Sequence, residues 1–148
     1  MIVLETNNCR KCVTSMKIES VFRIYYEDTD AGGIVYHANY LRFMERGRAE
    51  WLRSLGLDQN MLKSEYNISF VVVKSEIYYK SPARLNDEIK VSTEVEQLKR
   101  ASVVFMQKVE NSSVELCVAT NVVACVDAGN FLPKRIPLGL SGVFTNGG

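Results

Sequence analysis

The interval between apolar residues differs in one stretch of this chain, and that difference restricts the fold more than any other feature. Over residues 40–55 apolar side chains recur at intervals of three and four, which predicts an amphipathic helix with one buried face. Elsewhere the interval is two, which is typical of half-buried strands. Strands are predicted over 17–26, before the helix, and over 68–80, 89–97, 102–110 and 114–127, after it.

One strand, one long helix and four further strands indicate an α+β fold. Because short turns join the last three strands, we expect a curved antiparallel five-stranded sheet wrapped around the one long central helix. Such a sheet leaves open edges, so a homo-oligomer is expected. Asn39 is predicted as the helix N-cap and Gly56 as its stop, and Gly47 is expected to let the helix approach the sheet closely.

The chain has 148 residues, 47% of them hydrophobic, which predicts a single domain. We expect a flexible N-terminal extension over 1–16, the folded domain over 17–137 and an irregular C-terminal tail over 138–148. The formal charge of +1 gives no reason to expect nucleic-acid binding.

No apolar run approaches the roughly 20 residues that span a bilayer, and the start lacks the order of a secretory signal. A cytoplasmic protein without membrane insertion is therefore expected. Its four cysteines, including the closely spaced Cys9 and Cys12, are expected to stay thiols and to hold no metal.

The loop before the helix gathers the chemically active residues. Residues 27–39 hold three acids, two adjacent glycines and the only histidine, His37. Taken alone, the loop is compatible with an ordinary turn in which Asp30 binds its own backbone. His37 alone is compatible with a residue that merely enters the helix. A calcium loop is excluded, because Gly32 and Asn39 stand where acidic ligands would be needed.

Two runs in this region carry a resemblance to a known family. They read YYEDTDAGGIVYHANYL at 25–41 and FMERGRAEWL at 43–52, with weaker similarity over 20–137. The chain resembles the hot-dog-fold thioesterases of the 4-hydroxybenzoyl-CoA thioesterase family, most closely their YbgC-like branch, the acyl-CoA thioesterases associated with the Tol-Pal system. In this motif the catalytic aspartate falls on Asp30 and the branch's histidine on His37.

The resemblance implies a hot-dog fold, homodimers whose sheets join edge to edge, and dimers of dimers. It also implies hydrolysis of an acyl-CoA thioester without a metal or redox cofactor, CoA being part of the substrate. The benzoyl-hydrolysing branch differs around His37, so a short aliphatic acyl group is favoured over an aromatic one.

These residue types suit the implied chemistry. Asp30 is expected to act as general base on water or as nucleophile, and the sequence leaves both routes open. His37 is expected to donate to the carbonyl or to orient the carboxylate. Backbone amides of the loop and of the helix start are expected to bind the oxygen that gains charge. The substrate-binding residues expected here are Gly33, Ile34, Val35 and Tyr36.

The phosphates of CoA call for basic side chains, and the pair Lys99 and Arg100 in a hairpin turn is the favoured candidate. A solvated turn is the alternative reading of that pair. Two rival functions also stay open: a hot-dog hydroxyacyl dehydratase, and a non-catalytic module that binds acyl-CoA or acyl carrier protein.

Overall fold

The computed structural model describes residues 16–146, so the predicted extension over 1–16, apart from Met16, lies outside the described residues together with Cys9 and Cys12. The elements are, in chain order, β1 (Ile18–Arg23), the 3-10 turn η1 (Tyr26–Asp28), α1 (Asn39–Ser54), α2 (Gln59–Tyr66), β2 (Ile68–Tyr79), β3 (Glu88–Leu98), β4 (Ser102–Asn111), β5 (Val114–Asp127) and α3 (Leu138–Asn146).

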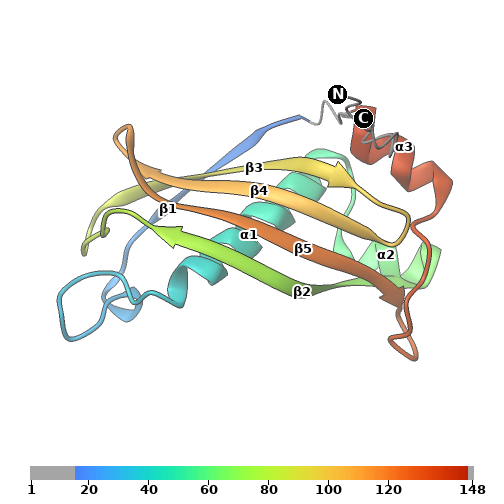
Figure 1. Cartoon of the computed structure of the whole chain (residues 1–148), viewed down its shortest axis with the longest axis horizontal. Coiled ribbons are helices and arrows are strands. Elements are labelled where there is room, and N and C mark those ends of the chain that lie inside the picture. The colour runs from blue at the N-terminus through green and yellow to red at the C-terminus, as the bar shows by residue number, and fades with distance from the viewer. Residues whose placement is uncertain (1–15, 147–148) are drawn as a thin grey trace, which may run out of the picture.

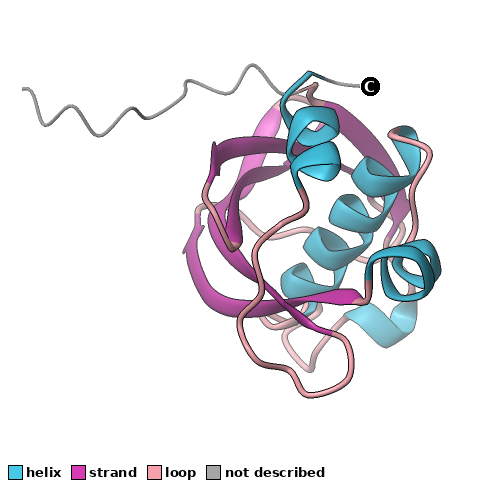
Figure 2. Ribbon diagram, turned by 90° about the vertical axis from the view of Figure 1, so that its right-hand side faces the viewer, coloured by secondary structure: helices cyan, strands magenta, loops and turns pink. Residues whose placement is uncertain are grey.

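The five strands form one sheet in the order β1-β3-β4-β5-β2, with every neighbouring pair antiparallel. The sheet curves around α1, which lies along its concave face (Figures 1 and 2). The predicted α+β arrangement of five antiparallel strands around one helix is therefore confirmed. Strands β1 and β2 form the two edges.

Helix α1 packs mainly on β1 and β3, through a buried stripe that includes Phe43, Met44 and Trp51. Gly47 lies at the centre of this stripe. A Cβ atom there would come within 2.8 Å of Thr93 Oγ1 and 3.0 Å of Val91 Cγ1. The close approach of the helix to the sheet that Gly47 predicts is confirmed.

A buried polar network separates two apolar clusters along α1. Gln107 is fully buried, and its Nε2 donates to the Met44 carbonyl oxygen at 2.9 Å and to Thr93 Oγ1 at 2.8 Å. Its Oε1 accepts from Arg48 and from Asn121, each at 2.9 Å. Burial lowers the pKa of Arg48, although the nearby charge of Glu45 acts in the opposite direction. Since every hydrogen-bonding group of Gln107 is satisfied, it costs little to bury and fixes α1 on the sheet.

Two predictions are wrong. Asn39 is not the N-cap: Ala38 holds that position, and the buried Asn39 side chain donates to Asp28 instead. The tail over 138–148 is not irregular, because α3 forms over most of it. Its residues Leu140 and Phe144, four positions apart, are buried in the Trp51 cluster, and this packing outweighs the low helix propensity of the tail's glycines. No helix within residues 16–146 is long and apolar enough to cross a bilayer.

Candidate active site

The loop between β1 and α1 folds back on itself and carries Asp30 at its tip. The Asp30 amide donates to the Ile34 carbonyl oxygen at 2.9 Å, and the Gly33 amide donates to the Asp30 carbonyl oxygen at 3.0 Å. Gly33 adopts a φ of +75°, which a residue with a side chain rarely takes, while a Cβ there would meet nothing within 4 Å. Glycine at this position therefore serves the backbone turn.

The Asp30 side chain is exposed, and one of its oxygens is already fixed. Oδ1 accepts from the Gly32 amide at 2.8 Å. A Cβ on Gly32 would lie 3.0 Å from that oxygen, so glycine leaves room for the carboxylate to close onto the amide. Oδ2 has no partner in the described chain. One carboxylate oxygen is thus anchored while the other is available to accept a proton or attack a carbon.

Asp28 is the buried acid of the loop and holds it to the helix. Only 7% of its surface is exposed. Its Oδ2 accepts from the Tyr25 amide at 2.8 Å, and its Oδ1 accepts from Asn39 Nδ2 at 2.6 Å. Its carbonyl oxygen accepts from the Tyr36 amide at 2.9 Å. These three bonds join both ends of the loop to the first turn of α1, so they set where Asp30 stands relative to the helix start.

His37 is exposed just before α1 and lies between two tyrosine rings. The centroid distance is 4.7 Å to Tyr36 and 6.3 Å to Tyr79, both edge-on. The Tyr79 hydroxyl also donates to the His37 carbonyl oxygen at 2.9 Å. Burial raises the pKa of Tyr79, which keeps this donor protonated. Within residues 16–146 no hydrogen bond or ion pair joins His37 to Asp30, so the two stand on the same loop without direct contact.

Several amides expected to bind the substrate oxygen are already occupied. The Val35 amide donates to the Ala83 carbonyl oxygen at 2.9 Å, and the Gly33 and Tyr36 amides bond within the loop. The Val35 side chain is also buried in the core. Among residues 33–38, the amides without an acceptor are those of Ile34, His37 and Ala38. The last two belong to the start of α1, where the helix dipole favours negative charge.

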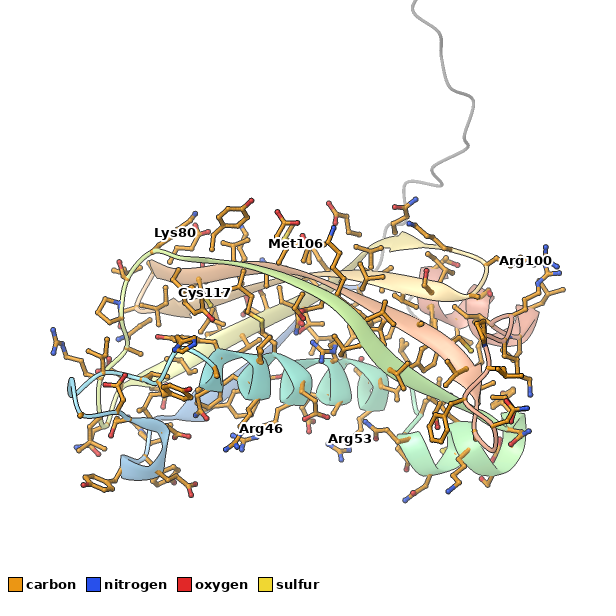
Figure 3. The ribbon with its side chains drawn as sticks, turned by 60° about the horizontal axis from the view of Figure 1, so that its bottom comes forward. Arg46, Arg53, Lys80, Arg100, Met106 and Cys117 are labelled. Carbon is orange, nitrogen blue, oxygen red and sulfur yellow. The ribbon has the colours of Figure 1, made fainter. Side chains whose placement is uncertain are left out.

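The basic pair Lys99 and Arg100 lies far from this loop within one protomer. Arg23, at the loop end of β1, pairs with Glu88 at the first position of β3, whereas Lys99 follows the last. An eleven-residue strand spans about 36 Å. Figure 3 shows Arg100 at the opposite end of the sheet from the loop that precedes α1. A single chain therefore does not bring the predicted phosphate-binding pair to Asp30.

Sequence reasoning missed two contributions to this site. Tyr79 ends a strand 42 residues after His37, and no local pattern links the two. The bond between Asp28 and Asn39 could not be predicted, because each residue already has a common local explanation. An aspartate is common in turns, and an asparagine is common at helix N-caps. Residues 16–146 contain no group of three or more histidine, cysteine or acidic side chains that could hold a metal ion.

Comparison with known proteins agrees with this architecture. A family model described as the thioesterase-like superfamily matches residues 25–143. The chain is 45% identical over 122 residues to the acyl-CoA thioesterase YbgC of Haemophilus influenzae, covering 82% of this chain and 90% of that protein. It is 43% identical over 116 residues to the acyl-CoA thioester hydrolase YbgC of Escherichia coli O6:H1, covering 78% and 86%.

Among solved structures, a probable thioesterase from Bartonella henselae superposes with a TM-score of 0.79 at 33% identity, covering 82% of this chain and all of that one. A protein of unassigned function from Aquifex aeolicus gives a TM-score of 0.80 at 28% identity, covering 86% and 98%. The chain belongs to the thioesterase-like superfamily, with YbgC thioesterases among its relatives, and it has the hot-dog fold.

Proposed function

We propose that this thioesterase hydrolyses aliphatic acyl-CoA to free acid and CoA, with Asp30 as general base or nucleophile. The observation that carries the proposal is the exposed Asp30 carboxylate, anchored through one oxygen to the Gly32 amide in the loop that leads into α1. The names of the YbgC relatives support the acyl-CoA substrate.

In the first route Asp30 takes a proton from water while the water oxygen bonds to the carbonyl carbon. In the second, the carboxylate attacks that carbon, and water opens the resulting mixed anhydride. In both routes the carbon–sulfur bond breaks and CoA leaves as a thiolate. The step uses a carboxylate, water and backbone amides, so we propose no metal or redox cofactor.

The unoccupied amides of Ile34, His37 and Ala38 are the donors we assign to the developing oxyanion. The His37 ring is held beside them by Tyr36 and Tyr79. We assign to it the donation of a hydrogen bond to the carbonyl or the orientation of the substrate.

We infer that two copies joined through β2 complete the site. This edge strand has 12 residues, and its Val72 and Val73 are 50% and 60% exposed. Antiparallel pairing of two β2 strands places the β3–β4 turn of the second copy at the Asp30 end of the first. Within the second copy, β3 lies three strand spacings, about 14 Å, from the β2 edge at which the two copies meet. An extended CoA bridges this distance, so Lys99 and Arg100 act across the interface. Pairing into tetramers and use of acyl carrier protein as an alternative carrier stay predictions.

We place the protein in the cytoplasm. Cys117 and Cys125 are buried free thiols, as expected for a protein in a reducing compartment.

The test is the release of CoA, followed with a thiol-trapping dye over a panel of acyl-CoA substrates. We expect Asp30→Asn to lower the rate at least about 100-fold while thermal unfolding is unchanged. Glu27→Gln, which alters another exposed acid of the loop, is the matched control and should stay near wild type. A dehydratase would release no CoA. A binding module would bind acyl-CoA without turnover, and its affinity would not depend on Asp30.

A further inference from the structure

A cavity of about 230 Å³ lies between α1, α2, β2 and α3, away from the catalytic loop. Neither Asp30 nor His37 lines it. Its walls are mainly apolar and include Trp51, Leu62, Phe70, Phe105 and Phe144. The exposed lining residues Glu45, Gln59 and Val72 mark the side on which it opens. A mainly apolar cavity with a polar opening suits the end of an aliphatic chain.

The concave face of β2 extends from the catalytic loop to this cavity. The side chains of Tyr79, Ile77 and Val72 face the concave side of the sheet, opposite the buried residues of β5. Tyr79 and Val72 are nevertheless 49% and 50% exposed, because α1 packs mainly on β1 and β3. Tyr79 contacts His37 at one end of this face, and Val72 lines the cavity at the other.

We propose that the cavity binds the distal part of the substrate's acyl chain, which makes long straight-chain acyl-CoA the preferred substrate. The proposal rests on the proposed function and adds the length of the chain. The resemblance in sequence favours short chains, whereas the exposed concave face of β2 and the cavity favour long ones.

The distance from the catalytic loop to the cavity sets the acyl-chain length that the cavity can bind. Ten residues of α1 separate Asn39, at the catalytic loop, from Ala49, which lines the cavity, and they span about 15 Å. An extended chain advances about 3.6 Å per three bonds, so about a dozen carbons reach the opening. A hexadecanoyl chain therefore places its last few carbons inside, whereas a butanoyl chain leaves the cavity empty. Each methylene group buried there favours binding by a factor of about four.

Helix α3 closes the far end of the cavity. The Phe144 ring lies 5.3 Å from the Trp51 ring and 6.1 Å from the Phe70 ring, and it is 2% exposed. Phe144 thus sets the maximum chain length, and Ala49 on the opposite wall keeps the space open.

The first test measures chain-length selectivity. The measured quantity is the ratio of kcat/KM for hexadecanoyl-CoA to kcat/KM for butanoyl-CoA. We expect Ala49→Leu, which fills the cavity, to lower this ratio at least tenfold, with Ala49→Val as the milder variant if the first does not fold. Leu138→Ala is the matched control, since this α3 side chain is 73% exposed and outside the cavity. A folded Ala49 variant whose ratio stays within twofold of wild type overturns the proposal.

The second test does not depend on turnover. Trp51 is the only tryptophan of the chain, so its fluorescence reports on the cavity directly. The probes are S-hexadecyl-CoA thioethers, which have no carbonyl to hydrolyse, with bromine either at the chain end or next to sulfur. We expect at least twofold stronger quenching by the end-labelled probe. Equal quenching by both, or none, contradicts the cavity assignment, whereas a wild type that binds the end-labelled probe yet hydrolyses no acyl-CoA contradicts the proposed function alone.

Discussion

The side-chain amide of Asn39 donates to the buried carboxylate of Asp28 at 2.6 Å, and this bond ties the first turn of α1 to the start of the loop that carries Asp30. The same carboxylate accepts from the Tyr25 amide. We therefore assign Asp28 a positioning role: it holds the loop so that the Asp30 carboxylate, the proposed catalytic group, keeps its place relative to the amides of the helix start.

Exchanging these two residues tests that role. Asp28→Asn leaves a buried donor without an acceptor, which costs about 1–3 kcal/mol of stability. We expect kcat to fall at least tenfold as the loop shifts. The double variant Asp28→Asn/Asn39→Asp restores one donor and one acceptor and should recover most of kcat. Steady-state kinetics and thermal unfolding check this, and a double variant no better than the single one would contradict it.

Tyr79→Phe removes the hydrogen bond to the His37 carbonyl oxygen and keeps the ring. We expect a loss of about 1 kcal/mol in unfolding free energy and a severalfold fall in kcat, because His37 is less well held. Tyr78→Phe is the matched control, since its hydroxyl bonds the exposed Glu76 instead. Equal kinetics for both variants would show that the Tyr79 bond does not serve the site.

Gly47→Ala should destabilise the fold by about 1–3 kcal/mol, because its Cβ would overlap Thr93 Oγ1 and Val91 Cγ1. This outweighs the gain of about 1 kcal/mol in helix propensity. Gly142→Ala in α3 makes the same change where a Cβ meets nothing within 4 Å, so it should leave stability unchanged or raise it. Urea unfolding of both variants measures the difference.

Burial raises the pKa of Cys117 to about 12, from an ordinary value of 9.0, with a smaller contribution from Glu115. Between these values the unfolded thiol loses its proton while the folded one keeps it. Stability from this group is therefore complete below pH 9 and is lost as pH rises towards 12, with a slope of at most about 1.4 kcal/mol per pH unit. We expect the free energy of unfolding to fall less between pH 8 and pH 10.5 in Cys117→Ala than in the wild type, as measured by urea unfolding. Identical losses would exclude Cys117 as the cause.

Val73→Lys should dissociate the proposed dimer, because a charge on the β2 edge opposes pairing with a second strand. Val21→Lys is the matched control on the other edge, where Val21 is 56% exposed. Sedimentation velocity should show monomers for the first variant and dimers for the second. CoA release should fall with the dimer, since Lys99 and Arg100 then no longer reach the partner's site.

Much of the fold follows from the sequence because its apolar pattern is strong. The strand predicted over 114–127 has those limits in the structure. β3 is one residue longer than predicted at each end, and β4 is one residue longer at its C-terminal end. The close approach at Gly47 could also be predicted, since a glycine in a buried helix stripe has few other uses.

The parts that could not be predicted depend on distant contacts. Helix α3 is stabilised by Phe144 against Trp51, and nothing within the tail itself reveals that contact. An unbroken alternation would place Val71 and Tyr79 on one face of β2, but a register shift between Val72 and Lys74 puts them on opposite faces. The residue types of the loop are the basis of the proposed chemistry, whereas its internal bonds, such as that between Asp28 and Asn39, could not be predicted from them.

The two edges of the sheet are unequal, and this difference limits growth of the assembly. Strand β1 has six residues and carries Glu19 and Arg23, each in an ion pair with its neighbour β3, whereas β2 has 12 residues with exposed valines. A sheet that can extend on one side only stops at two copies, with a short charged strand at either outer end. The asymmetry that favours the proposed dimer thus also protects the protein against open-ended polymerisation into fibres.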